Sequence, residues 1–282
     1  MPVNLNNAST QLLYSTTRVV AETGADSSVG TAFFFNFKGD DDRNVPVLVT
    51  NKHVIDGADQ GQILIHEAIP GPDGTSLPSP ASSAISVLDF SAKWIRHPGG
   101  LDLCAMPVGP IGQQLRAVGK DPFYRTLSES LIWTDDQLAE LTALEEVVMV
   151  GYPIGLSDSV NNLPILRRGI TASHPGVDFE GKSLGVVDIA VFPGSSGSPV
   201  MILNQGTYAT TDGIVVGSRV VFLGILASGP QFSAEGAMQL VDIPTAQGQM
   251  ISTNIPIHLG FYIKAKELLV LKDEVFREMK VS

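Results

Sequence analysis

The chain has 282 residues, a formal net charge of -11 at pH 7 and 44% hydrophobic residues. This length and apolar fraction are enough for one large all-β unit or for two small domains with their own cores. Lysine and arginine form no cluster along the sequence. Because phosphate binding needs such clusters, the composition argues against nucleic-acid binding, and we attribute the acidic charge to solubility.

The single cysteine, Cys104, excludes an internal disulfide and favours a reducing compartment. Residues 1–20 lack the basic stretch and following apolar core of a secretory signal. No apolar run approaches the roughly 18 residues that a membrane-spanning helix needs. These features together predict a cytoplasmic protein that is not bound to a membrane.

Ten short segments, rich in β-branched and aromatic residues and bounded by Gly, Pro, Asn or Asp, predict β-strands. They are residues 17–22, 30–37, 46–54, 61–69, 102–109, 146–153, 167–173, 184–191, 199–204 and 220–227. Because strand mostly follows strand, the pattern favours antiparallel barrels or a sandwich over a parallel α/β sheet.

Two segments predict helices, and two others predict irregular structure. Residues 134–147 begin with Thr134 as a helix N-cap and continue with leucines spaced three apart. Residues 264–280 carry an apolar face typical of a helix docked on the protein body. This face consists of Leu268, Leu271, Val275 and Met279. Residues 69–83, rich in Pro, Gly and Ser, predict a surface loop, and residues 111–135 predict a connection between two halves.

Three segments far apart in the chain carry residue types that suit nucleophilic catalysis. His53 ends an apolar strand, Asp102 follows two glycines at the start of another, and Ser196 lies in a loop of small residues. A serine hydroxyl is a weak nucleophile that needs an adjacent base, and an imidazole held by a carboxylate supplies one. Each residue alone would be unremarkable, as a strand-end histidine, a turn aspartate or a loop serine. All three in this order and these contexts favour an active site.

The motifs around these residues resemble those of the trypsin-like (chymotrypsin-fold) serine proteases, most closely the bacterial high-temperature-requirement-like branch. The matching motifs are Thr-Asn-Lys-His at 50–53, Asp-Leu-Cys-Ala at 102–105 and Pro-Gly-Ser-Ser-Gly-Ser-Pro at 193–199. Segments 30–35, 150–156, 167–173 and 223–229 also match in kind and order. The resemblance covers roughly residues 15–265 and implies an all-β fold of two antiparallel six-stranded β-barrels with a C-terminal helix.

The resemblance also implies a division of the chain. We expect residues 1–110 to form an N-terminal barrel carrying His53 and Asp102, and residues 111–145 to be a linker with a helix. Residues 146–263 would form a C-terminal barrel carrying Ser196, and residues 264–282 a C-terminal helix. Because only this helix follows the second barrel, we expect no PDZ domain.

By the same resemblance, His53 is the general base, Asp102 orients it, and Ser196 is the nucleophile. The backbone N–H groups of Gly194 and Ser196 would form the oxyanion hole. The substrate pocket would be formed by Ala190, Val191, Ala227, Ser228 and Gly229. It holds no carboxylate, so we expect a small or medium apolar residue before the scissile bond.

Two positions depart from the family pattern. Ser195 stands where digestive members carry the aspartate that binds a newly cut N-terminus, so activation by zymogen cleavage is not expected. Ser198 replaces the second glycine after the nucleophile.

The leading prediction is a serine endopeptidase that acts on a protein or peptide substrate without a cofactor. The five histidines show no metal-ligand spacing, so no metal site is predicted. One alternative is a catalytically silent protease-fold scaffold or binding protein, and another is an esterase that shares the same three residues. The sequence assigns no oligomeric state.

Overall fold

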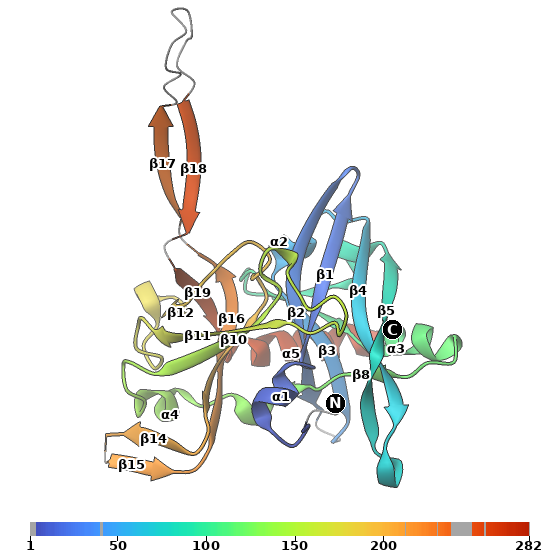
Figure 1. Ribbon diagram of the computed structural model, residues 1–282, viewed down its shortest axis with the longest axis horizontal. Coiled ribbons are helices and arrows are strands. Elements are labelled where there is room, and N and C mark those ends of the chain that lie inside the picture. Colours follow the sequence, from blue (N-terminus) through green and yellow to red (C-terminus); the bar gives the residue numbers. More distant parts are fainter. Residues whose placement is uncertain are drawn as a thin grey trace, which may run out of the picture.

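A computed structural model describes residues 4–39, 42–211, 213–229, 231–237, 250–256 and 258–281, and shows two β-rich halves side by side (Figure 1). Helix α5 (Glu267–Val281) packs against the N-terminal half. Its fully buried Leu268 and Leu271 belong to a core cluster that also contains Ala105 from the N-terminal half and Met201 from the C-terminal half. One apolar core therefore joins both halves, and the predicted C-terminal helix is confirmed.

The N-terminal half forms one sheet with the strand order β5-β4-β1-β2-β3-β7-β6, to which β8 and β9 add at β4 and β2. The longer strands are β1 (Thr16–Thr23), β2 (Asp26–Lys38), β3 (Asn44–Thr50), β4 (Gln60–Pro70), β5 (Ser76–Leu88) and β7 (Cys104–Pro107). Three two-residue strands, β6 (Ile95–Arg96), β8 (Pro122–Phe123) and β9 (Leu127–Ser128), complete the sheet. The sequence predicts five of the six longer strands, all except β5. The sheet has nine strands, where the resemblance implied a six-stranded barrel.

The segment expected to be a loop at residues 69–83 is instead mostly strand, because β5 pairs with the extended end of β4. Its prolines, Pro78 and Pro80, signal a loop in the sequence. They are compatible with β5 because it ends the strand order, where a missing N–H breaks no central ladder.

The C-terminal half closes into a six-stranded barrel in the order β10-β11-β12-β19-β16-β13, which confirms the predicted barrel. Its strands are β10 (Glu146–Gly151), β11 (Ile165–Thr171), β12 (Leu184–Asp188), β13 (Pro199–Asn204), β16 (Arg219–Ser228) and β19 (Leu259–Lys264). Two hairpins lie outside the barrel, namely β14 (Thr207–Thr210) with β15 (Gly213–Val216) and β17 (Gln231–Ala237) with β18 (Met250–Pro256). The second hairpin extends away from the body of the protein (Figure 1).

The remaining helices are short. They are α1 (Ala8–Leu12), α2 (Lys52–Ile55), α3 (Gly109–Ala117) and α4 (Asp135–Ala139). Helix α3 occupies part of the connection at 111–135, where the sequence predicts none. In α5, Met279 is partly exposed, whereas the other three residues of the predicted face are buried. Among the described residues, no helix has the length and apolar character needed to span a membrane.

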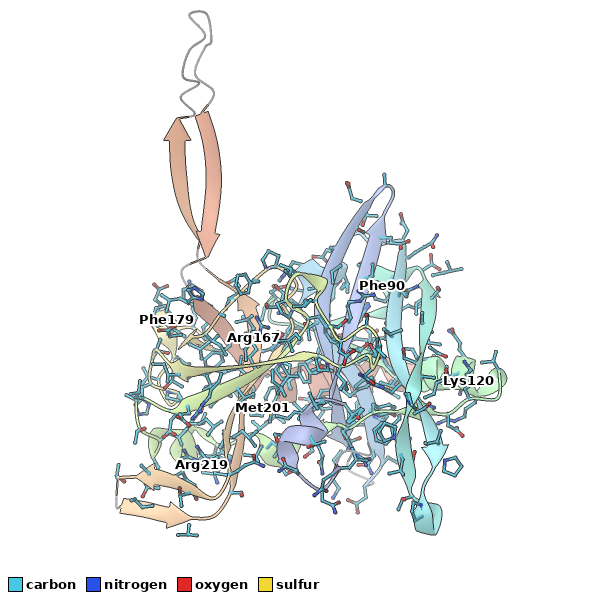
Figure 2. All side chains as sticks on the ribbon, in the orientation of Figure 1. Phe90, Lys120, Arg167, Phe179, Met201 and Arg219 are labelled. Carbon is cyan, nitrogen blue, oxygen red and sulfur yellow. The ribbon has the colours of Figure 1, made fainter. Side chains whose placement is uncertain are left out.

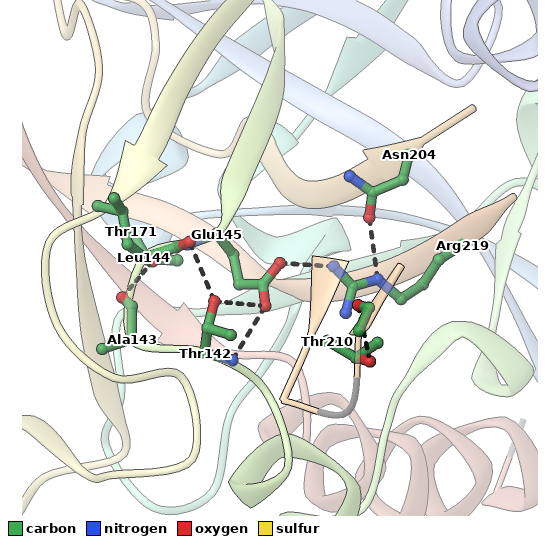
Figure 3. A network of polar contacts seen from close by, with 9 residues as sticks. Thr142, Ala143, Leu144, Glu145, Thr171, Asn204, Thr210 and Arg219 are labelled. Atoms are coloured by element: carbon green, nitrogen blue, oxygen red, sulfur yellow. Dashed lines mark hydrogen bonds and ion pairs between the residues drawn. The ribbon is translucent and has the colours of Figure 1, made fainter. Parts of the chain in front are cut away.

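The helix predicted over 134–147 is wrong in extent. Thr134 does cap it, in a capping box with Gln137, but the helix ends at Ala139. The reason is a buried polar network around Glu145 (Figure 3). The Thr142 N–H and hydroxyl donate to Glu145 Oε1 at 3.0 and 2.9 Å, and Arg219 Nη2 donates to Glu145 Oε2 at 2.5 Å. These bonds fix residues 142–145 in a non-helical turn.

The Glu145–Arg219 ion pair is well shielded, with side chains only 6% and 8% exposed. Arg219 also donates to Asn204 Oδ1 at 2.9 Å and lies over the ring of Tyr208. The pair thus joins the start of β10 to β13, β14 and β16.

We expect Glu145→Ala to lower the free energy of unfolding by about 3–5 kcal/mol, because it leaves the buried Arg219 guanidinium without its carboxylate. The neighbouring Glu146, which is 56% exposed and pairs with Arg168 at the surface, is the matched control. Glu146→Ala should cost about 0–1 kcal/mol. Urea denaturation of both variants tests this, and equal losses would contradict a special role for the Glu145 pair.

Candidate active site

His53 and Asp102 meet because of the register of two strands. His53 lies in α2, directly after β3, and Asp102 precedes β7, while Thr50 of β3 stands opposite Cys104 of β7. His53 Nδ1 lies 2.5 Å from Asp102 Oδ2, and the His53 backbone N–H donates to Asp102 Oδ1 at 3.1 Å. The carboxylate thereby fixes the imidazole through Nδ1 and leaves Nε2 for another partner.

The electrostatics of this pair favour an ionised carboxylate. Burial of Asp102 raises its pKa, but the hydrogen bonds from His53 and its positive charge outweigh burial and hold that pKa below the usual value. Asp102 is therefore ionised at neutral pH. The His53 side chain is 49% exposed, so a substrate can reach the imidazole.

Ser196 lies in the connection between β12 and β13, at a point where the backbone is tightly specified. Gly194 and Gly197 both have φ +85°, a region that favours glycine. A Cβ on Gly197 would lie 2.0 Å from the Thr31 carbonyl oxygen, so only glycine allows this close approach to β2. The small residues of this loop thus permit direct contact between the two halves of the molecule.

Thr31 of β2 connects the Ser196 loop to the strand that leads to His53. Its N–H donates to the Ser196 carbonyl and its hydroxyl donates to the Gly194 carbonyl, both at 2.9 Å. Its own carbonyl accepts from the Thr50 hydroxyl at 2.7 Å. The loop therefore lies beside the end of β3. Within the described chain the Ser196 hydroxyl has no hydrogen-bond partner. The structure therefore contains the His53–Asp102 bond but no bond between Ser196 and His53.

The Gly194 and Ser196 N–H groups have no acceptor among the described residues. The preceding carbonyl, that of Pro193, accepts from the Ile154 N–H at 2.5 Å. Because the peptide is planar and trans, the Gly194 N–H points away from Ile154. Both groups proposed for the oxyanion hole are therefore free to donate to a ligand.

The serine at position 198 is accommodated by a missing side chain elsewhere. Ser198 is fully buried, and a Cβ on Gly151 would lie 2.1 Å from its hydroxyl oxygen. Gly151 ends β10, and the Tyr152 N–H that follows donates to the Thr31 hydroxyl at 3.0 Å. The volume added by Ser198 is thus offset by Gly151.

The residues predicted to form the substrate pocket fall into two groups. Val191 lies close to two glycines, since a Cβ on Gly229 or on Gly260 would be 2.9 Å from a Val191 methyl carbon. Ala190 stands beside Val191 in the same loop. Ala227 and Ser228 instead line a separate cleft of about 370 Å³ beside Asp102. The other residues of the cleft are Leu101, Phe179, Glu180, Leu184, Phe261 and Ile263.

Several residues around the site were not predicted from the sequence. Thr31 falls in the matching segment 30–35 but has no distinctive type. Arg167 of β11 donates from one nitrogen, Nη1, to the Ala190 carbonyl at 2.7 Å and to the Ser195 hydroxyl at 2.8 Å. The sequence signal that could have identified Arg167 is a charged residue on the partly buried face of a strand. Among the described residues no group of three His, Cys, Asp or Glu side chains could hold a metal ion.

Residues 30–208 match the family described as the trypsin-like peptidase domain. The chain belongs to this family, and the matched range contains His53, Asp102 and Ser196.

Individual relatives are distant. The chain is 23% identical to a protein named serine protease HhoA from Synechocystis sp. over 158 residues. The aligned segment covers 56% of this chain and 32% of that protein. It thus spans about a third of that relative. The Rv3671c protease of M. tuberculosis in its active form is 12% identical, with a TM-score of 0.48 over 97% of this chain and 87% of that one. A serine endoprotease from Yersinia pestis is 14% identical, with a TM-score of 0.48 over 98% and 68%.

The contact between Gly197 and Thr31 is open to a direct test. Gly197→Ala places a Cβ 2.0 Å from a backbone oxygen, so we expect a loss of about 1–3 kcal/mol of unfolding free energy beyond that of a control glycine. Gly181→Ala is the control, because Gly181 also has a positive φ, +69°, but has no atom within 4 Å of a Cβ. Urea denaturation measures both. The contact carries no special weight if the two variants lose the same stability.

Proposed function

We propose that the protein is a serine endopeptidase that hydrolyses peptide bonds through Ser196, His53 and Asp102. The observation that carries the proposal is the His53 Nδ1–Asp102 Oδ2 contact of 2.5 Å. The Ser196 loop lies nearby, and its backbone is hydrogen-bonded to Thr31 of β2. Family membership supports the same reaction class and a protein or peptide substrate. In this proposal the N-terminal half, residues 1–110, supplies base and carboxylate, and residues 146–263 supply the nucleophile. Residues 111–145 link them, and the C-terminal segment 264–282 braces both.

The proposed reaction begins when Ser196 Oγ attacks the substrate carbonyl carbon and its proton passes to His53 Nε2. Asp102 keeps Nδ1 protonated and stabilises the imidazolium. The imidazolium proton then passes from Nε2 to the leaving amine nitrogen as the C–N bond breaks, and the acyl group stays on Ser196. Water, activated by the same imidazole, hydrolyses the ester and restores Ser196.

The negative oxygen of the tetrahedral intermediate needs fixed donors. The N–H groups of Gly194 and Ser196 meet this need, because neither is bound to another described residue. Removing one such donor in enzymes of this kind costs about 10²–10³ in kcat. The separate cleft beside Asp102, lined largely by apolar side chains, suits substrate residues near the scissile bond.

We place this activity in the cytoplasm, without a cofactor, a nucleic acid or a membrane as partner. The single cysteine supports this compartment, because Cys104 is buried and free, and the described chain holds no disulfide.

Ser196→Ala should abolish labelling by a fluorophosphonate probe and lower kcat for a peptide substrate on the order of 10⁶-fold, because the nucleophile is lost. The exposed Ser27→Ala is the control and should label like the wild type. Mass spectrometry of the labelled peptide identifies the modified serine. An unlabelled wild-type protein would favour the scaffold alternative. Labelling with hydrolysis of esters but not of peptides would favour the esterase.

Val191 is proposed to set the preference for small or medium apolar residues before the scissile bond, because it lies against Gly229 and Gly260 where the pocket would otherwise deepen. Val191→Gly should raise kcat/KM for Phe relative to Ala at this position by roughly 10–200-fold, the range for a change of a few carbons in an apolar pocket. The 81%-exposed Val160→Gly serves as the control. A peptide panel measures the ratio, and an unchanged ratio would place the pocket elsewhere.

A further inference from the structure

A single guanidinium nitrogen holds both ends of the segment that leads to Ser196. Arg167 Nη1 donates to the carbonyl of Ala190 at 2.7 Å and to the hydroxyl of Ser195 at 2.8 Å. Ser195 is fully buried, and its oxygen also accepts from the Phe192 N–H at 3.3 Å. Arg167, labelled in Figure 2, belongs to β11 in the C-terminal half and so contacts this loop from the barrel side.

The placement of Arg167 is unfavourable for stability. Its Nε and Nη2 atoms are buried, and neither has a partner among the described residues. Burial lowers the pKa of the guanidinium to about 10, which still leaves it charged at neutral pH. Its neighbour Arg168 instead pairs with Glu146 at the surface. A buried cation without a carboxylate costs free energy, so its presence calls for a role other than stabilising the barrel.

Three carbonyl groups between residues 193 and 196 are bound by other parts of the chain. Ile154 donates to the Pro193 carbonyl, and Thr31 donates to the carbonyls of Gly194 and Ser196. Arg167 adds the Ala190 carbonyl and anchors the side chain of Ser195. With these carbonyls bound, the N–H groups of Gly194 and Ser196 remain without an acceptor among the described residues.

From this arrangement, and resting on the proposed function, we infer that Arg167 is a positioning residue that holds the oxyanion-hole loop in its assembled form. It acts through Ser195, the residue next to the nucleophile. The cation is part of the folded barrel, so the loop needs no new N-terminus to order it. Arg167 touches neither substrate nor reacting atoms in this role.

The test compares Arg167→Met, which removes the charge and the donors at similar volume, with Arg168→Met on the exposed side of the same strand. We expect Arg167→Met to lower kcat about 10²-fold, the cost of a small misplacement of catalytic groups, with KM changed less than about threefold. Its melting temperature should be equal to or higher than that of the wild type, because the unpaired cation is gone. Arg168→Met should leave kcat within about twofold. Active-site titration with a fluorophosphonate corrects each kcat for the reactive fraction.

A second measurement does not depend on catalysis. Hydrogen exchange followed by mass spectrometry should show faster exchange in residues 190–198 of Arg167→Met and unchanged exchange in the other barrel strands. Arg167→Lys should restore much of both kcat and protection, because an ammonium group has three donors and can reach two acceptors.

The outcomes separate the two proposals. A wild-type protein that neither labels nor cleaves would overturn the proposed function, while the exchange measurement would still decide whether Arg167 holds the loop. Unchanged exchange over 190–198 would overturn the role of Arg167, whatever the kinetics. A second result would also overturn it, namely an Arg167→Met variant with a lower melting temperature whose kcat falls only as much as its reactive fraction. Arg167 would then be an ordinary structural residue.

Discussion

The candidate site depends on the hydrogen bonds of one buried residue, Thr31, which joins the two halves of the molecule. Its N–H and hydroxyl bind the carbonyls of Ser196 and Gly194 from the C-terminal half. Its carbonyl binds the Thr50 hydroxyl at the end of the strand that leads to His53, and its hydroxyl oxygen accepts the N–H of Tyr152. Every polar backbone and side-chain group of Thr31 is thus used. The relative position of His53 and Ser196 follows from these contacts rather than from either half alone.

This arrangement also decides which backbone groups remain available. A folded chain pairs nearly all of its buried N–H and C=O groups. Around Ser196 the carbonyls are bound by Thr31 and Ile154, whereas the N–H groups of Gly194 and Ser196 are unbound within the described chain. The proposed oxyanion hole would therefore consist of N–H groups that the loop's own hydrogen bonds leave unused. Glycine is favoured where the loop turns through positive φ.

The parts of the structure that the sequence predicts are those with a local signal. Alternating apolar segments predict the strands, and small residues with positive-φ requirements predict the Ser196 loop. The errors come from long-range contacts. The proline-containing segment 76–88 becomes an edge strand because β4 is long enough to pair with it. The predicted helix stops at Ala139 because Glu145 binds Arg219, which is 74 residues away. Similarly, nothing local in the sequence shows that Val191 lies against Gly229 or that Gly151 makes room for Ser198.

Some departures from local structural rules lie around the Ser196 loop. Ile154 has φ +47°, a strained value for a β-branched residue, and it is the residue whose N–H binds the Pro193 carbonyl. The Ser198 hydroxyl is buried without a partner among the described residues, as are two nitrogens of Arg167. Each feature lowers stability on its own and persists only where the surrounding structure determines it. The closed barrel and the shared core beneath α5 provide that surrounding structure. Such departures beside the candidate site are expected where a fold is adapted to chemistry rather than to stability.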